Sequence, residues 1–417
     1  MRRRLLLAAA AIVVLAGGAA VGWYLHIKHA SRDIRGSSTV EFTPTQTTPP
    51  KPPEPGIAWP VYGHDPEGLR FANGVSLAPP FRRIWTFRAR TLVEFPPAVA
   101  YGRLFVANNG GTVFAIGAEN GRRAWSYASH RCVAASPAVD DHLVFESFLN
   151  IPPCNRAPSS SLTGELIAFH AGSGRIAWRR RLGGPSESSP LVHGGRVYVG
   201  DWSGKVSAFD EHTGKRVWST AMQGQVKGGA SIAGRRLFVG DYSGHVTALD
   251  ARTGRMVWQS SAQPRFGSTG RFYATPAVAY GRVYIGATDG KVYSFGAASG
   301  DLRWSQSTGG YVYSSAAVWR DRVFVGSYSQ RFTCFDAATG AIKWQFTADG
   351  PISGSATVVA GRVYFATLHG TTYALDARTG RKLWTFPDGK YTPVVADADR
   401  LYLVGYTRIY GLVQRRG

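Results

Sequence analysis

Eight side chains stand at one equivalent position along this 417-residue chain, and several are of types that bind ligands. Each precedes a short segment of small residues that ends in Pro or Ala, as in Glu187-Ser188-Ser189-Pro190. Two carboxylates, two ammonium groups and two phenols meeting in one place suit a polar or anionic ligand, or a peptide from a partner. The alternative is a ring of solvated loop residues that binds nothing. The eight residues are Glu94, Ala134, Glu187, Lys227, Tyr273, Tyr313, Ser353 and Lys390.

The sequence contains no comparable set of residues for metal binding or for nucleophilic catalysis. The ten histidines are scattered, and the three cysteines form no CxxC or CxxxC pair of the kind that holds structural zinc. No G-x-S-x-G motif lies between a predicted strand and a helix. Gly228-Gly229 falls on a predicted strand instead of preceding a helix, which argues against a phosphate-binding loop. We therefore predict no metal site and no catalytic residue.

Two of the three cysteines fall in one repeating unit and could form a disulfide. Cys132 begins the unit that ends at Trp178, and Cys154 lies in an insertion that lengthens the same unit. In an oxidising compartment a bond between them would pin the insertion, residues 147–163, against the unit. Cys334 stands where other units carry Ala, so we predict a buried and inert thiol there.

A tryptophan recurs at nearly regular intervals and divides the chain into eight units. Successive intervals are 40, 53, 40, 40, 46, 40 and 40 residues, and the phrase Ala-x-Asp-x-x-Thr-Gly-x-x-x-Trp, as at residues 248–258, stands before several of the tryptophans. Each unit contains four short segments rich in Val, Tyr and Gly, which is typical of a β-propeller blade. A residue needed in every unit serves packing, so we predict that these indoles dock neighbouring blades. They are Trp85, Trp125, Trp178, Trp218, Trp258, Trp304, Trp344 and Trp384.

The two ends of the repetitive region predict a closed ring. Residues 391–413 supply three strands of a last unit, and the sequence of residues 83–87 echoes the fourth strand of the preceding unit at residues 382–386. An N-terminal strand that completes the last blade would close the ring and remove exposed sheet edges. The sequence therefore predicts an all-β, eight-bladed β-propeller of four-stranded blades over residues 58–417.

The repeated phrase resembles the pyrroloquinoline-quinone (PQQ) type of β-propeller repeat over about 360 residues. The segment from Trp59 to Asp65, with Arg70 after it, is similar to the lead-in of the same superfamily. Three units depart from the phrase, and we expect looser turns in them. In these units Gly117, His170 and Gly296 replace the Asp.

The resemblance implies two contrasting functions. A quinone-dependent dehydrogenase would hold PQQ and a calcium ion in the channel, but the sequence lacks the vicinal Cys-Cys pair and the Glu–Asn–Asp set of such enzymes. Similarity to envelope-assembly propellers implies a binding scaffold without a cofactor, which is our leading prediction. The PQQ-dependent oxidoreductase is the alternative. A third hypothesis is a sensor of a cell-wall fragment, with Lys227 and Lys390 holding the ligand.

The first 57 residues predict a membrane anchor and a spacer. Three arginines at positions 2–4 precede an uncharged run at residues 5–25, which as a helix would be roughly 31 Å long, about the thickness of a bilayer's hydrocarbon core. The arginines would keep the N-terminus in the cytoplasm, and a cleaved signal peptide is the alternative. We predict a cytoplasmic tip and transmembrane anchor over residues 1–29 and an extended Pro/Thr-rich linker over residues 30–57.

The net charge of +22 favours partners that carry negative charge. Arginines are spread through the turns of every unit without a basic helix, and the predicted topology removes the propeller from nucleic acid. We predict envelope proteins or anionic envelope polymers as partners, and a single-pass cell-membrane protein with an extracytoplasmic propeller. The insertion 147–163 and the lengthened loop 260–271 are the candidate partner surfaces.

Overall fold

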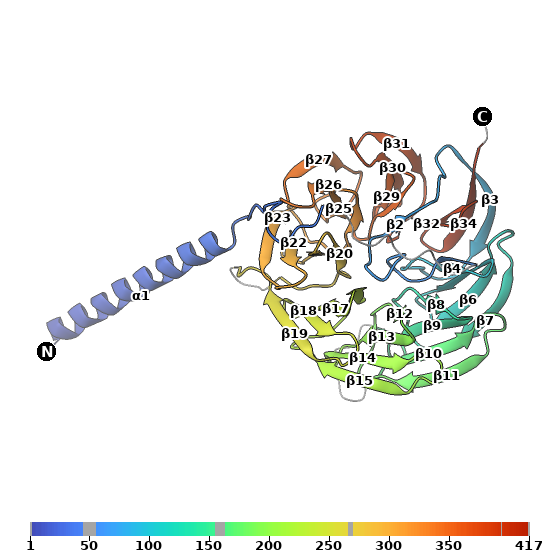
Figure 1. Ribbon diagram of the computed structural model, residues 1–417. Helices are drawn as coiled ribbons and strands as arrows, with labels where there is room; N and C mark the ends of the chain where they lie inside the picture. Colours follow the sequence, from blue (N-terminus) through green and yellow to red (C-terminus); the bar gives the residue numbers. More distant parts are fainter. Residues whose placement is uncertain (1, 45–55, 155–162, 266–269, 393, 416–417) are drawn as a thin grey trace.

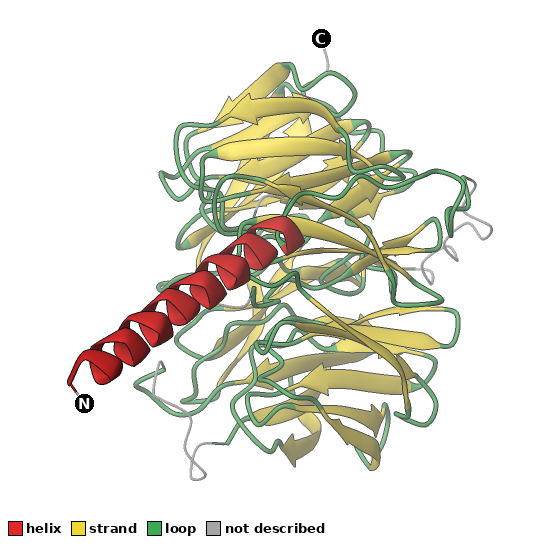
Figure 2. Ribbon diagram, turned by 90° about the vertical axis from the view of Figure 1, so that its left-hand side faces the viewer, coloured by secondary structure: helices red, strands yellow, loops and turns green. Residues whose placement is uncertain are grey.

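Eight sheets, each with four antiparallel strands, stand around a common axis in this protein, whose structure is a computed structural model (Figure 1). It describes residues 2–44, 56–154, 163–265, 270–392 and 394–415. A long helix, α1 (Arg2–Ala30), precedes the sheets and projects away from the disc that they form (Figure 2). The predicted all-β, eight-bladed propeller of four-stranded blades is confirmed.

Each blade is a twisted sheet of four strands, numbered here as blades 1 to 8 in chain order. Blade 1 consists of β4 (Ala98–Ala100), β5 (Arg103–Ala107), β6 (Thr112–Gly117) and β7 (Arg123–Ala128), and blade 2 of β8 (Ala138–Asp140), β9 (Leu143–Phe148), β10 (Glu165–His170) and β11 (Ile176–Arg181). Blade 3 consists of β12 (Leu191–His193), β13 (Arg196–Gly200), β14 (Lys205–Asp210) and β15 (Arg216–Ala221), and blade 4 of β16 (Ser231–Ala233), β17 (Arg236–Gly240), β18 (His245–Asp250) and β19 (Met256–Ser261).

Blades 5 to 8 repeat the arrangement. Blade 5 consists of β20 (Ala277–Ala279), β21 (Arg282–Gly286), β22 (Lys291–Gly296) and β23 (Leu302–Ser307), and blade 6 of β24 (Ala317–Trp319), β25 (Arg322–Gly326), β26 (Arg331–Asp336) and β27 (Ile342–Thr347). Blade 7 consists of β28 (Thr357–Val359), β29 (Arg362–Ala366), β30 (Thr372–Asp376) and β31 (Lys382–Phe386), and blade 8 of β32 (Val394–Ala396), β33 (Leu401–Val404), β34 (Arg408–Gln414) and β3 (Phe81–Arg88). Two short strands add to inner edges: β1 (Ile57–Trp59) to blade 1 and β2 (Phe71–Ala72) to blade 7.

Blade 8 joins the two ends of the propeller, as the sequence predicts. Strand β3 pairs antiparallel with β34, from Phe81 opposite Gln414 to Arg88 opposite Arg408, and becomes the outermost strand. The innermost strands of blades 8 and 1, β32 and β4, lie side by side. The ring is therefore closed by a sheet whose strands come from both ends of the domain.

The recurring Trp and Gly of the repeat contact each other across blade boundaries. Trp304 of blade 5 is fully buried, and its indole Nε1 donates a hydrogen bond of 3.0 Å to the carbonyl of Ala337 in blade 6. Gly340 of blade 6 lies against the same indole at a φ of +72°, where a Cβ would come within 2.7 Å of the ring. Only glycine combines this φ with this close approach. Corresponding indole bonds reach the next blade from Trp85, Trp125, Trp178, Trp218 and Trp258.

The Asp and Thr of the repeat hold the turn before the outermost strand. In blade 4, Oδ1 of Asp250 accepts hydrogen bonds from the backbone N–H of Thr253 at 2.8 Å and from its hydroxyl at 2.8 Å. The same pair of bonds forms at Asp210, Asp336 and Asp376. The carboxylate thus satisfies donors that the sheet leaves free.

Residues 57–72, which we call the lead-in, cross the channel and pair with the inner edges of the blades. Strand β1 pairs with β4, β2 pairs with β28, and carbonyls between them accept hydrogen bonds from the innermost strands of blades 2, 4, 5, 6 and 7. The accepting residues are Pro60, Pro66, Glu67, Leu69 and Arg70. The lead-in therefore satisfies backbone N–H groups that would otherwise face the channel.

Residues 31–44, which we call the strap, lie along the outer side of blade 5. Ile34 forms an isolated antiparallel bridge with Ser305, and the guanidinium of Arg282 donates to the carbonyls of Glu41 and Val40. The sequence predicts an extended Pro/Thr-rich spacer over residues 30–57; within it, the strap exchanges backbone hydrogen bonds with blade 5, between Ile34 and Ser305. Residues 45–55 of the predicted spacer lie outside the described residues.

Glu41 of the strap replaces the Asp that blade 5 lacks. Its carboxylate accepts hydrogen bonds from the backbone N–H of Ser299 at 2.9 Å and from the Ser299 hydroxyl at 2.8 Å, which are the bonds that Asp250 makes to Thr253. A Cβ on Gly296 would lie 1.8 Å from Oε2 of Glu41. The sequence suggests a looser turn in blade 5. The structure shows instead that a carboxylate distant in the sequence completes this turn.

The sequence predicts that α1 is a transmembrane helix. Over the part of the chain that the structure describes, no helix combines the length and the hydropathy required to cross a membrane.

Candidate functional site

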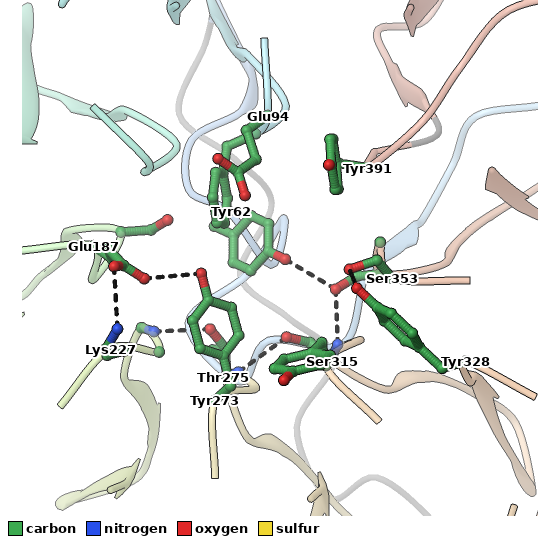
Figure 3. A pocket seen from close by; sticks show the side chains of 17 residues that line it. Tyr62, Glu94, Glu187, Lys227, Tyr273, Thr275, Ser315, Tyr328, Ser353 and Tyr391 are labelled. Carbon is green, nitrogen blue, oxygen red and sulfur yellow. Dashed lines mark hydrogen bonds and ion pairs between the residues drawn. The ribbon is translucent and has the colours of Figure 1, made fainter. Parts of the chain in front are cut away.

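A cavity of about 520 Å³ lies in the channel of the propeller. Its walls come from the short segments that precede the innermost strands, and the lead-in contributes Tyr62 (Figure 3). Six of the eight residues singled out in the sequence line it: Glu94, Glu187, Lys227, Tyr273, Tyr313 and Ser353. Alternation along the segment accounts for this placement, because the residue before each position is buried in the blade, and it is apolar in all but blade 3, where it is Ser186.

The other two residues of the predicted set do not line the cavity. Ala134 packs beside the buried Cys132, Leu149 and Trp202. The ammonium group of Lys390 lies 4.6 Å from the centre of the Tyr406 ring, and Tyr391 occupies the cavity wall in its place. The prediction for Lys390 assumed the register of the other blades, and in blade 8 the neighbouring residue faces the cavity.

Hydroxyl groups link neighbouring blades around the cavity. The backbone N–H of Thr275 donates to the hydroxyl of Ser315 at 2.9 Å, and the N–H of Ser315 donates to the hydroxyl of Ser355 at 2.7 Å. Gly229 and Ser136 make the same kind of bond, to Thr275 and Ser189. The small Ser and Thr residues of the repeat thus fix the spacing between the blade segments that carry the variable side chains.

Three of the variable side chains form one hydrogen-bonded cluster. The ammonium group of Lys227 lies 3.3 Å from Oε1 of Glu187, and the hydroxyl of Tyr273 donates to Oε2 at 3.0 Å (Figure 3). The same ammonium group stands 4.1 Å from the centre of the Trp202 ring and 4.8 Å from that of Tyr242. Glu187 therefore has its charge balanced within the protein.

Glu94 differs from Glu187 in having no such balance. Among the described residues no hydrogen bond or ion pair reaches its carboxylate, and Figure 3 shows it in the cavity above Tyr62 without a bonded neighbour. Burial, followed by the nearby charge of Glu187, raises the pKa of the Glu94 carboxyl to about 7. The carboxylate is therefore partly protonated at neutral pH and can accept a hydrogen bond or a cation.

Four aromatic residues of the cavity were not singled out in the sequence. Tyr62 was noted only as part of the lead-in, and its hydroxyl lies 2.9 Å from that of Ser355. Tyr328 comes from the turn between β25 and β26, where its hydroxyl donates to Ser353. An aromatic residue at the same turn in blades 3 and 4, Trp202 and Tyr242, was a signal that this position reaches the channel opening. The remaining two are Phe95 and Tyr391.

Two of the three cysteines are paired in blade 2, and the third lies in blade 6. Cys132 and Cys154 form a disulfide with their Cα atoms 5.6 Å apart, and Cys334 is a free, buried thiol. Burial, as the largest influence, raises the pKa of the Cys334 thiol above its ordinary value. Residues 155–162 of the insertion and 266–269 of the loop 260–271 lie outside the described residues, so these two predicted partner surfaces stay predictions.

The donor set of the cavity does not fit calcium. The lining residues offer two carboxylates and no Asn or Asp, and one of the carboxylates is paired with Lys227. Calcium requires six to eight oxygen ligands. Across the described residues no group of three or more His, Cys, Asp or Glu side chains is placed to hold a metal ion. We therefore derive no step through a calcium-bound quinone.

Comparison of the sequence with known families assigns the propeller to one family. The family described as "Outer membrane protein assembly factor BamB" matches residues 78–148, 155–219, 202–312 and 290–413. The chain belongs to this family. The PQQ-type resemblance read from the repeats is thereby confirmed. No curated protein sequence matches the chain.

Solved structures with the same fold include a BamB protein and two dehydrogenases. BamB from Moraxella catarrhalis is 20% identical with a TM-score of 0.64, covering 81% of this chain and 99% of that one. A europium-containing methanol dehydrogenase is 15% identical with a TM-score of 0.71, covering 86% and 91%. The quinohemoprotein alcohol dehydrogenase of Comamonas testosteroni is 15% identical with a TM-score of 0.69, covering 86% and 81%. At these identities the likeness shows the fold alone.

Proposed function

We propose that this BamB-family propeller is a binding scaffold of the bacterial cell envelope, and that it holds a partner or ligand at its channel cavity. The observation that carries the proposal is the contrast between shared walls and variable side chains. Hydroxyl bonds between blades repeat around the channel, whereas Glu94, Glu187, Lys227 and Tyr273 differ from blade to blade. A fixed frame with distinct, convergent polar groups is suited to recognition.

We further propose that the propeller lies outside the cytoplasm and that α1 anchors it to the cell membrane. The disulfide between Cys132 and Cys154 supports an oxidising compartment. The side chains of Ile12, Val13 and Leu15 on α1 are 66–72% exposed, so this helix presents apolar groups that the propeller does not cover. The arginines at positions 2–4 support a cytoplasmic N-terminus.

The proposed partners are envelope proteins or anionic envelope polymers. The family match supports a protein partner, because the family description names an assembly factor of outer membrane proteins. The net charge of +22 supports attraction to anionic polymers and headgroups. We do not propose nucleic acid as a partner. A sensor of a wall fragment would use the same cavity, through Lys227 but not Lys390, which turns to Tyr406.

The proposal is tested by cross-linking the full chain to envelope components in membrane extracts. The double variant Lys227→Met/Glu187→Gln removes both members of the ion pair and so leaves neither of them as an unpaired buried charge. Capture of the cross-linked component is expected to fall at least tenfold, whereas Lys382→Met on the exposed outer strand β31 should retain it. If the natural chain, the double variant and Lys382→Met all capture the component equally, the cavity is not the binding site.

The alternative, a PQQ-dependent oxidoreductase, is tested on the same preparation. The full chain is titrated with PQQ in the presence of calcium, and dye-linked oxidation of alcohols and sugars is measured. Saturable PQQ binding together with turnover would overturn the scaffold proposal. We expect neither, because the lining residues offer calcium too few oxygen ligands.

A further inference from the structure

The cavity carries one carboxylate more than it has cations. Its charged lining residues are Glu94, Glu187 and Lys227. Lys227 and the hydroxyl of Tyr273 satisfy Glu187, at 3.3 Å and 3.0 Å. Glu94 has no partner among the described residues, so the lining has a net charge of −1 once Glu94 is ionised. This local charge is opposite in sign to the net charge of the whole chain, +22.

The remaining large side chains of the cavity are aromatic. The rings of Tyr273 and Tyr313 lie 5.6 Å apart, and those of Tyr313 and Tyr328 lie 5.3 Å apart, so they form a continuous wall. Tyr62 and Phe95, with ring centres 5.4 Å apart, lie near Glu94. The face of an aromatic ring attracts organic cations more strongly when water is excluded. The aromatic lining residues are Tyr62, Phe95, Tyr273, Tyr313, Tyr328 and Tyr391.

Cations of the protein itself already lie on rings around the cavity. The guanidinium of Arg70 stands 3.8 Å from the centre of the Tyr62 ring, and the ammonium of Lys227 lies 4.1 Å from that of Trp202. Aromatic faces close to the cavity are thus placed to receive positive charge. The cavity volume of about 520 Å³ is within the range of small-ligand sites.

We infer that the cavity binds an organic cation, an alkylammonium or guanidinium group, with Glu94 as its counter-ion and the surrounding rings as its walls. The inference rests on the proposed binding function and names the chemistry that the site recognises. The group can come from a free amine or from a Lys or Arg side chain of a partner, and the test separates these two sources.

The inference requires that affinity rise with pH. A cation binds the ionised form of Glu94, and burial together with Glu187 raises the pKa of that carboxyl to about 7 in the free protein. Affinity should therefore increase about tenfold between pH 6 and pH 8 and level off above that range. Alkylammonium probes stay protonated throughout. The charged and titratable groups around Glu94 are Glu187, Lys227, Tyr62, Tyr273 and Tyr391.

The test is isothermal titration of the full chain with n-butylammonium and methylguanidinium, against butyrate as an anion of similar size. Nα-acetyl-lysine amide and Nα-acetyl-arginine amide represent the side chains of a partner. Saturable binding of the cations but not of butyrate is expected, and Glu94→Gln should weaken it at least tenfold and remove the pH dependence. Glu119→Gln, at an exposed turn of blade 1, should bind as the natural chain does.

A second variant keeps the test decisive if Glu94→Gln alters folding. Tyr391→Leu removes one aromatic wall and should weaken cation binding severalfold without changing the pH dependence. Tighter binding of the amino-acid amides than of the small amines would identify a partner's side chain as the source, and the reverse would identify a free amine. The inference is overturned if butyrate binds as tightly as butylammonium, or if the Glu94→Gln variant binds the cations as tightly as the natural chain does. Continued loss of envelope capture in the Lys227→Met/Glu187→Gln variant would then leave the scaffold proposal standing.

Discussion

Blades 5 and 6 have the same repeat pattern but different surroundings. In blade 5 the strap covers the outer strands, Trp304 is fully buried, and its indole donates to the carbonyl of Ala337. In blade 6 Trp344 is partly exposed, and its Nε1 has no hydrogen-bond partner in the part of the chain that the structure describes. The difference shows that one repeat residue contributes unequally in two blades, according to what packs over it.

The first prediction compares the two tryptophans and has the largest expected effect. Trp304→Ala should reduce the free energy of unfolding by about 3–5 kcal/mol, because it opens a cavity and removes the indole hydrogen bond to the carbonyl of Ala337, which keeps the bond from the Tyr284 hydroxyl. Trp344→Ala should cost at least about 1 kcal/mol less, since no hydrogen bond is lost. Urea denaturation of both variants measures the difference. Equal losses would show that the strap and the indole bond are energetically irrelevant.

The second prediction concerns the Gly that replaces Asp in blade 5. Gly296→Asp restores the carboxylate of the repeat and excludes Glu41, because the new Cβ would lie 1.8 Å from Oε2 of Glu41. The strap should detach while the turn in blade 5 stays formed. Amide hydrogen exchange at Ile34 and Gly36, whose N–H groups bond to Ser305 and Thr339, should accelerate at least tenfold.

Blade 1 supplies the matched control for this substitution. Gly117 also stands at the Asp position, but Asn120 of the same turn fills the space beside it. Gly117→Asp should therefore leave hydrogen exchange in the strap unchanged. If both variants accelerate exchange equally, or neither does, Glu41 is not the group that holds the strap.

The third prediction is a smaller effect of acid on the strap. Burial alone would raise the pKa of Glu41, but hydrogen bonds from Ser299 and Arg303 outweigh it and hold the pKa below its ordinary value of 4.5. A lowered pKa stabilises the docked strap above pH 4.5, and this stabilisation is lost as pH falls through the pKa of the docked state. The protection of the Ile34 amide, measured relative to its intrinsic exchange rate at each pH, should fall severalfold below pH 4.5 in the natural chain. Glu41→Gln should show low protection at every pH, and an acid-sensitive Glu41→Gln strap would contradict the prediction.

Local repetition made most of the fold predictable. The tryptophan spacing predicted eight blades, and the likeness of residues 83–87 to residues 382–386 predicted which strand closes the ring. The variable position predicted six residues of the cavity, because strand alternation fixes which side chain faces the channel. Ala134 and Lys390 do not line the cavity, and in blade 8 the neighbouring Tyr391 does so instead of Lys390.

The sequence by itself determined the number of blades, their closure and the indole packing, since these follow from short patterns that recur in each unit, including the fourth-strand pattern at residues 83–87. Only the tertiary structure decided that Tyr62 of the lead-in enters the cavity and that Glu41 completes a turn 258 positions away. It also decided that, within the described part of the chain, Glu187 has two partners and Glu94 has none. Contacts across such separations leave no periodic signal. They depend on which segments the closed ring brings together.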